Sequence, residues 1–176
     1  MESAQNVLRR ELSRLRRFAY SLTGSAADAD DLVHDLAVKI LEKGLPDMPD
    51  PVPWMITLCK NLWIDELRYR AVRSRKNSDG AGSSGGSSQS DGSEAMDVNV
   101  EVCNSLNKVY CHRVVEGLQA LPEGQRVALS LVTIEGMSYA ETAKVLDVPI
   151  GTVMSRVARA RAMLLEIFSD KTETTL

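Results

Sequence analysis

The clearest pattern of apolar and polar positions in the chain runs from Ser138 to Leu165. Ser138 and Glu141 have the spacing of a capping box, which predicts a short helix beginning there. Asp147 tolerates a left-handed backbone and Pro149 suits the first turn of a helix, so we expect a turn of about three residues and then a second helix. An apolar stripe along the second helix is formed by Ile150, Val153, Val157, Ala160 and Leu164. The face opposite this stripe carries Ser155, Ala158, Arg159 and Ala162.

Small and cationic residues on the free face are typical of a helix-turn-helix whose second helix enters the major groove of DNA. Small side chains permit a close approach, and an arginine can bind guanine. A helical hairpin with a solvated, charged face is the alternative interpretation, because short helix-turn-helix patterns also arise by chance.

Two further helices are predicted before residue 45. Apolar residues recur every three or four positions between Val7 and Leu22 and predict an amphipathic helix that ends at Thr23–Gly24. Its apolar positions are Leu8, Leu12, Leu15, Ala19 and Leu22. Ser25 begins the next predicted helix, which ends near Gly44 and carries near its beginning Asp28, Asp30, Asp31 and Asp35. The helix dipole favours acid at this end, but four aspartates exceed what capping needs, so a docking surface for a partner is a second interpretation.

The third predicted helix, from Pro53 to about Arg75, follows a loop that holds four of the six prolines. Aromatic residues alternate with Asn61, Arg68 and a basic C-terminal end on this helix, a combination that suits an unpaired strand of nucleic acid. The alternative is that both tryptophans belong to the core. We favour that alternative for Trp54 and leave it open for Trp63.

Residues 77–102 are rich in glycine, serine and acid, and they predict a flexible linker. We therefore expect an all-α protein of two small helical domains, residues 1–76 and residues 103–176, the second with the helix-turn-helix. Two more helices are expected before that motif, from about Cys103 to Leu118 and from Leu121–Pro122–Glu123 to Glu135.

The 176 residues have a net charge of −3, and residues 77–104 hold five acids without any lysine or arginine. A chain without a strong positive field should bind DNA weakly by itself, which indicates a subunit that works with another component. No segment approaches the roughly 20 apolar residues of a membrane span, and the arginine-rich N-terminus leads into no apolar segment, so neither insertion nor export is expected.

The cysteines and histidines of the chain predict neither a metal site nor an active site. Cys59, Cys103 and Cys111 are an odd, scattered set that suits a reducing cytoplasm. Cys103, Cys111 and His112 do not complete a zinc site, because the one other histidine, His34, is far away in the sequence. The histidines lack a partnered nucleophile and no Gly-rich phosphate loop is present, so we expect no cofactor and no enzyme.

Three segments, in order along the chain, carry a resemblance to a known family. They are LTGSAADADDLVHDLAVKILEK, PWMITLCKNLWIDELRYR and LPEGQRVALSLVTIEGMSYAETAKVLDVPIGTVMSRVARARAML. Together they resemble a bacterial group 4, or extracytoplasmic-function (ECF), RNA polymerase sigma factor of the sigma-70 family. The resemblance covers nearly the full chain apart from the linker.

This resemblance implies that residues 1–76 bind core RNA polymerase and the melted −10 element, while residues 103–176 read the −35 element as duplex DNA. The residues facing polymerase would be Asp30, Asp31, Leu32, Asp35 and Leu36. Those at the −10 strand would be Met48, Asp50, Asn61, Trp63 and Arg68. Those lining the −35 groove would be Thr152, Met154, Ser155, Arg156, Ala158, Arg159 and Arg161. An anti-sigma protein is implied as a further partner.

Three residues depart from the family pattern. His34 stands where glutamine is common, Met154 where lysine or arginine is usual, and Ala158 where histidine or an aromatic residue is common. The base preference at −35 therefore stays open. Two alternative functions also remain, namely a stand-alone helix-turn-helix regulator and a sigma-like adaptor that binds only proteins.

Overall fold

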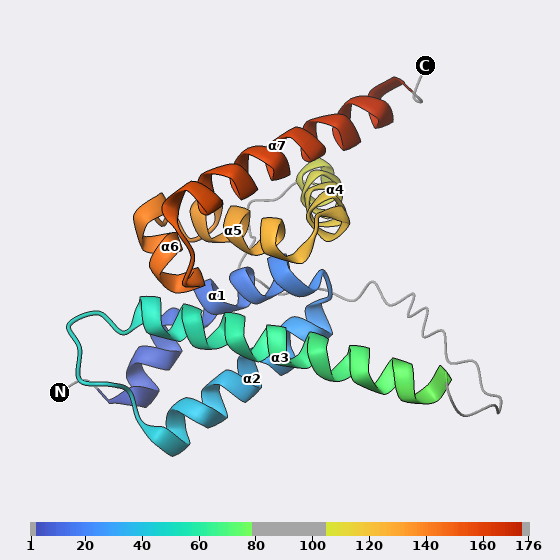
Figure 1. Cartoon of the computed structure of the whole chain (residues 1–176). Helices are drawn as coiled ribbons and strands as arrows, with labels where there is room; N and C mark the ends of the chain where they lie inside the picture. Colours follow the sequence, from blue (N-terminus) through green and yellow to red (C-terminus); the bar gives the residue numbers. More distant parts are fainter. Residues whose placement is uncertain (1–2, 79–104, 174–176) are drawn as a thin grey trace.

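The computed structural model describes residues 3–78 and 105–173, which form helices joined by short turns and one proline-rich loop (Figure 1). The helices are α1 (Ala4–Thr23), α2 (Ala26–Lys43), α3 (Val52–Ser78), α4 (Ser105–Ala120), α5 (Glu123–Thr133), α6 (Tyr139–Leu146) and α7 (Ile150–Glu173). No helix in the described part of the chain combines the length and hydropathy needed to cross a membrane.

The first unit, α1 to α3, packs around an apolar core to which all three helices contribute. Its fully buried side chains include Leu15, Phe18, Leu22, Leu36, Ile40, Met55 and Ile56. The predicted stripe of α1 is confirmed except at Leu12, which lies at the edge of the stripe and is 46% exposed. Phe18 lies at the opposite edge of the stripe and is fully buried, so the buried face of α1 includes Phe18 and not Leu12.

The predicted ends of the first two helices are confirmed by their backbone geometry. Gly24 ends α1 in the left-handed region with φ 72°, and its N–H donates to the carbonyl of Tyr20. The Ser25 hydroxyl accepts a hydrogen bond from the Asp28 N–H at 3.3 Å at the start of α2. Such side-chain acceptors stabilise a helix start because the first N–H groups have no partner within the helix.

The helix-turn-helix is confirmed in the second unit, α4 to α7. Both hydrogen bonds of the Ser138–Glu141 capping box form, and Asp147 ends α6 with φ 52°. Val153, Val157 and Ala160 of α7 are buried as expected. Ile150 was expected in the same stripe but is 48% exposed, because it is the first residue of α7 and precedes the part of that helix that packs on α5 and α6.

The two units are packed against each other, whereas the sequence predicted two domains joined by a flexible linker. Val127 and Leu131 of α5 belong to the same apolar cluster as the core of the first unit. Ala128 and Leu129 of that helix are buried instead against α7. Figure 1 shows the result, with α5 lying between α1 below it and α7 above it.

Polar contacts join the same two units. The Arg14 guanidinium of α1 forms an ion pair with Glu135, with 2.7 Å between Nε and Oε2, and the Glu135 side chain is fully buried. The Lys60 ammonium of α3 donates to the carbonyl of Val145, near the end of α6, at 3.2 Å. The first unit therefore supports the helix-turn-helix directly.

The predicted linker lies mostly outside the described residues. Its first two residues, Asn77 and Ser78, are corrected to the last two of α3, which continues past the expected end near Arg75. Residues 79–104 are not described, and α4 is first described at Ser105, two residues after the predicted beginning.

Replacing Arg14 tests the buried ion pair. Arg14→Ala leaves the carboxylate of Glu135 buried without its cation, and we expect a loss of about 2–3 kcal/mol in the free energy of unfolding at neutral pH. Burial raises the pKa of Glu135 from its ordinary value of 4.5, against the lowering effect of Arg14. As the pH falls, Glu135 in the folded state therefore takes up a proton before it does in the unfolded state. The decrease in the free energy of unfolding caused by Arg14→Ala should consequently become smaller between neutral pH and about pH 5.

Chemical denaturation at several pH values measures this dependence. The control is the double variant Arg14→Ala with Glu135→Gln, which has no carboxyl group at this position and should lack the extra pH dependence. Parallel stability curves for the single and double variants would show that the Glu135 carboxylate is not held in a buried environment.

Candidate nucleic-acid interface

The free face of α7 is the first candidate surface for nucleic acid. Because Val153, Val157 and Ala160 are buried against neighbouring helices, the opposite side of α7 is turned to solvent. The exposed candidates for the −35 groove are Met154, Ala158, Arg159 and Arg161. The half-buried candidates are Thr152, Ser155 and Arg156. The structure thus brings all seven onto residues 152–161 of one helix.

Two of the half-buried candidates have contacts within the protein. The Ser155 hydroxyl donates to the carbonyl of Thr152 at 3.0 Å, so its proton is used within α7. The guanidinium of Arg156 lies beside Gly124 on α5, where an added Cβ would come within 3.5 Å of its Cζ. Arg159 and Arg161 make no hydrogen bond or ion pair with the described residues, so their cationic ends are free to bind.

The candidates for polymerase contact on α2 divide into three groups. Asp30 forms a two-bond ion pair with Arg16 of α1, at 2.6 and 2.8 Å, and so has a structural partner. Leu36 is fully buried in the core, which corrects the expectation that it faces a partner, and Leu32 is also buried but borders a groove. Asp31 and Asp35 are exposed and have no ion-pair partner among the residues described.

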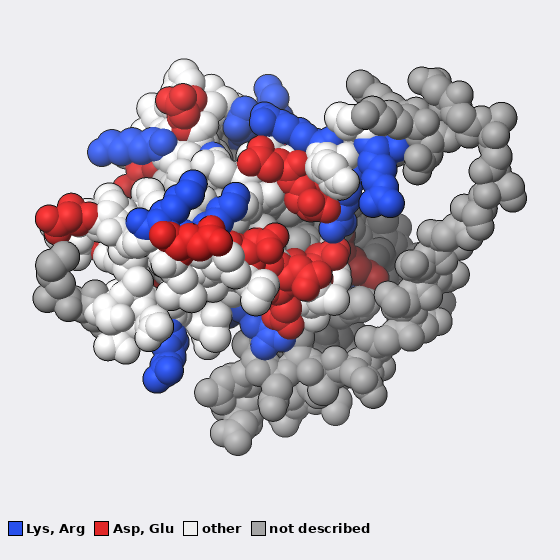
Figure 2. Space-filling model, turned by 90° about the horizontal axis from the view of Figure 1, so that it is seen from below, with Lys and Arg blue, Asp and Glu red and all other residues white. Residues whose placement is uncertain are grey.

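Acidic side chains gather on the side of the molecule where α2 lies. Figure 2, which views the molecule from below, shows a band of acidic side chains with basic ones beside it. Asp28, the first acid of α2, accepts from Arg70 of α3 at 3.4 Å. Of the four aspartates near the start of α2, Asp31 and Asp35 are therefore the two without an ion-pair partner in the described structure.

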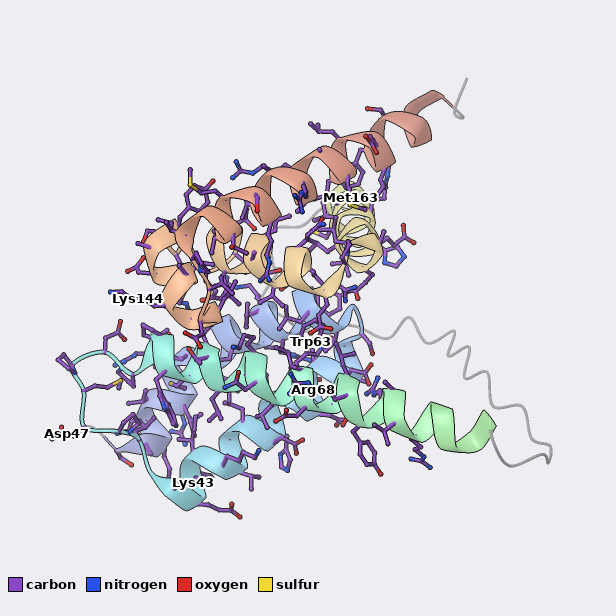
Figure 3. All side chains as sticks on the ribbon, viewed as in Figure 1. Lys43, Asp47, Trp63, Arg68, Lys144 and Met163 are labelled. Atoms are coloured by element: carbon purple, nitrogen blue, oxygen red, sulfur yellow. The ribbon has the colours of Figure 1, made fainter. Side chains whose placement is uncertain are left out.

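The candidates for the −10 strand do not form one surface. Asn61 and Arg68 are exposed, two turns apart on one side of α3. Met48 and Asp50 are exposed on the proline-rich loop, where Asp50 also caps α3 by accepting from the Val52 N–H at 3.0 Å. Trp63 points to another side of α3 and is 4% exposed. Figure 3 shows it between α3 and the second unit.

The structure assigns both tryptophans to the core of the first unit, to different extents. Trp54, which we favoured for the core, is partly buried and packs against it, whereas Trp63, which was left open, is buried in it beneath Arg126 of the second unit. No helical pattern within α3 could show this, because the group that covers Trp63 comes from α5.

That group is Arg126, which sequence reasoning missed. Its guanidinium lies over the Trp63 ring, 5.8 Å from the centroid. It donates to the Leu22 carbonyl at 2.8 Å and the Gln119 Oε1 at 2.6 Å. It also donates to the carbonyls of Gln119 and Leu121. Burial lowers the pKa of Arg126, and the nearby Glu123 partly opposes this.

A groove of about 680 Å³ lies beside this contact. Asp31, Leu32 and Asp35 line it from α2, and Trp63 and Arg70 line it from α3. The second unit closes it with Gln119 and Arg126. The free acids of α2 and the covered tryptophan of α3 therefore border the same groove.

The cysteines and histidines form no metal site in the described structure. No group of three His, Cys, Asp or Glu side chains there is arranged to hold an ion. Cys59 is buried, and burial raises the pKa of its thiol to about 12, with a further contribution from Glu135. Cys111 is exposed, and Cys103 lies outside the described residues.

Both units match known sequence families. Residues 7–73 match the family described as Sigma-70 region 2, and residues 111–164 match Sigma-70, region 4. The ECF RNA polymerase sigma factor EcfG of Rhodopseudomonas palustris is 33% identical over 153 residues, covering 85% of this chain and 76% of the relative. The ECF RNA polymerase sigma factor SigE of Mycolicibacterium smegmatis is 28% identical over 177 residues, covering 99% of this chain and 65% of the relative.

A solved structure has the same arrangement of helices. The sigma factor RpoE from Bartonella quintana, in complex with the anti-sigma factor NepR, superimposes with a TM-score of 0.69 and 28% sequence identity. The match covers 94% of this chain and 96% of that one.

Replacing Arg126 tests whether it holds the two units together over Trp63. Arg126→Ala removes the cation over the ring and four hydrogen bonds, and we expect a loss of about 2 kcal/mol in the free energy of unfolding. In a Trp54→Phe background, which leaves Trp63 as the one tryptophan, its emission should shift to the red and acrylamide should quench it more strongly. Arg161→Ala in the same background removes an exposed arginine and should change neither signal. Unchanged quenching in Arg126→Ala would mean that the packing does not depend on this side chain.

Proposed function

The chain belongs to the ECF group of the sigma-70 family, and on this premise we propose that it binds core RNA polymerase and directs it to promoters. One observation carries the proposal most directly. A helix-turn-helix whose first helix is capped at both ends presents a recognition helix that carries two unpaired, exposed arginines and no acid between residues 150 and 165. This is the arrangement that duplex DNA requires, since phosphate attracts the cations and base edges are read by side chains in the groove.

We propose that residues 103–176 read the −35 element through α7. Arg159 lies opposite the buried stripe and is positioned to reach base edges. Arg161 directly follows the buried Ala160 and flanks the stripe, so it is positioned for a phosphate. Thr152, Met154, Ser155, Arg156 and Ala158 complete this surface.

Residues 1–76 are proposed to contact polymerase and the −10 strand. Asp31 and Asp35 support the first role, because they are exposed acids without a structural partner. Asn61 and Arg68, with Met48 and Asp50 on the loop, are accessible to a single strand. Trp63 lies beneath Arg126 of α5, so we infer that α5 moves away from α3 and the two units separate when the −10 strand binds. Residues 77–102 would join the units during this movement.

We further infer that an anti-sigma protein regulates the chain. The support is the Bartonella quintana relative, which was solved in complex with the anti-sigma factor NepR. Because the proposed partners are polymerase and promoter DNA, we place the protein in the cytoplasm. We propose that it acts there without a cofactor and does not itself catalyse a reaction.

Charge reversal on α2 tests polymerase binding. Asp31→Lys combined with Asp35→Lys should weaken binding to core polymerase by at least tenfold, since two exposed acids on one face become cations. Circular dichroism should show native helicity, because neither side chain has a structural partner. The control, Asp47→Lys with Glu166→Lys, makes the same change in net charge at exposed acids outside α2. Equal affinities for both double variants would exclude Asp31 and Asp35 as the docking residues.

A pair of arginine variants tests the −35 surface. Arg159→Ala should cost about 1–3 kcal/mol on a cognate −35 duplex and relax base preference at one position. Arg161→Ala should weaken binding to all sequences alike and reduce the salt slope by about one unit. Binding of each holoenzyme is measured on matched and mismatched duplexes. Equal, sequence-independent losses for both variants would contradict the proposed orientation of α7.

A further inference from the structure

The exposed side of α7 that we propose to face the major groove of DNA is rich in apolar side chains. Ile150, Met154 and Ala158 follow one another at intervals of four residues, so they form a row on one side of the helix. Ile150 is 48% exposed and Met154 is 52% exposed. A single exposed apolar side chain is ordinary on a protein surface. Here the row lies on the helix that is proposed to enter the DNA groove.

The polar side chains nearby leave few groups free to read bases. The Ser155 hydroxyl donates within its own helix, and the Arg156 guanidinium lies beside Gly124. Arg159 is exposed and lies opposite the buried stripe. Among the arginines on that side it is the one whose hydrogen-bond donors have no partner in the described structure. Apart from the half-buried Thr152, what remains for contact with base edges is the thioether of Met154 and the methyl group of Ala158.

The charges around the row favour DNA over protein as the occupant. Residues 150–165 hold three arginines and no aspartate or glutamate. Phosphates on both sides of a major groove complement such a surface. Ala158 also has a small side chain, so it does not keep the helix from lying deep in the groove.

The major groove displays one apolar group, the C5 methyl of thymine. From this we propose that Met154, with Ala158 beside it, reads thymine methyl groups in the −35 element, while Arg159 supplies the hydrogen bonds. The inference rests on the proposed function and adds the class of base that this chain selects. Burying one methyl group corresponds to about a fourfold gain in affinity.

Removing that methyl group tests the inference. Holoenzyme containing the full chain first selects duplexes from a promoter library randomised at the −35 region. Each thymine of the selected element is then replaced singly by deoxyuridine, which lacks only the C5 methyl. The wild-type holoenzyme should lose about fourfold in affinity at one or two of these positions.

Two variants identify the side chain responsible. Met154→Ala keeps a strong helix former at an exposed site and should bind the thymine duplex less tightly, with no further loss on deoxyuridine at the same position. Leu165→Ala removes an apolar side chain that is 68% exposed on the same helix, three turns away from Met154, and should behave like the wild type.

The outcomes separate this inference from the proposed function. Selected elements that tolerate deoxyuridine at every thymine, or a Met154→Ala variant that retains the full loss on deoxyuridine, would overturn the methyl contact and leave the sigma-factor role standing. If the holoenzyme selects no sequence beyond those that core polymerase selects alone, both the proposed function and this inference are overturned.

Discussion

The structure depends on α5 being buried on both of its sides. Residues 127–131 are all buried, five in succession, which a helix at the surface of a single small unit does not require. Val127 and Leu131 complete the core of the first unit, whereas Ala128 and Leu129 complete the core beneath α7. Separation of the two units would expose the first of these faces to water. The apolar contact therefore explains why the units pack together, and polar contacts such as Arg14 with Glu135 are arranged at its edge.

This packing affects the proposed DNA surfaces differently. The free side of α7 lies away from the first unit, and Figure 1 shows α7 and α2 at opposite sides of the molecule. The −35 surface is thus open while the units are together. Trp63, by contrast, is covered by Arg126, whose hydrogen bonds to the Leu22 and Leu121 carbonyls fix its position. The same helix that completes both cores closes one proposed nucleic-acid contact and leaves the other accessible.

Much of the candidate site could be predicted from the sequence, because recognition by α7 depends on helical periodicity. Once the buried stripe was identified, Ala158 and Arg159 followed as residues of the free face. Periodicity was less informative on α2, where it could not separate Asp30, which pairs with Arg16 of α1, from Asp31 and Asp35. The resemblance assigned Leu32 and Leu36 to a partner surface, but both side chains are buried in the core.

The sequence by itself determined the local structure, namely the helices, their ends and the helix-turn-helix. Ser138 with Glu141, Gly24 and Asp147 act on backbone groups within a few residues, so their effects are visible without knowledge of the fold. Only the tertiary structure decided that Trp63 is covered, that Glu135 is a buried partner of Arg14 and that α5 serves two cores. The physical reason is distance along the chain. These contacts join residues that can be more than a hundred positions apart, and burial depends on which surfaces meet after the helices have formed.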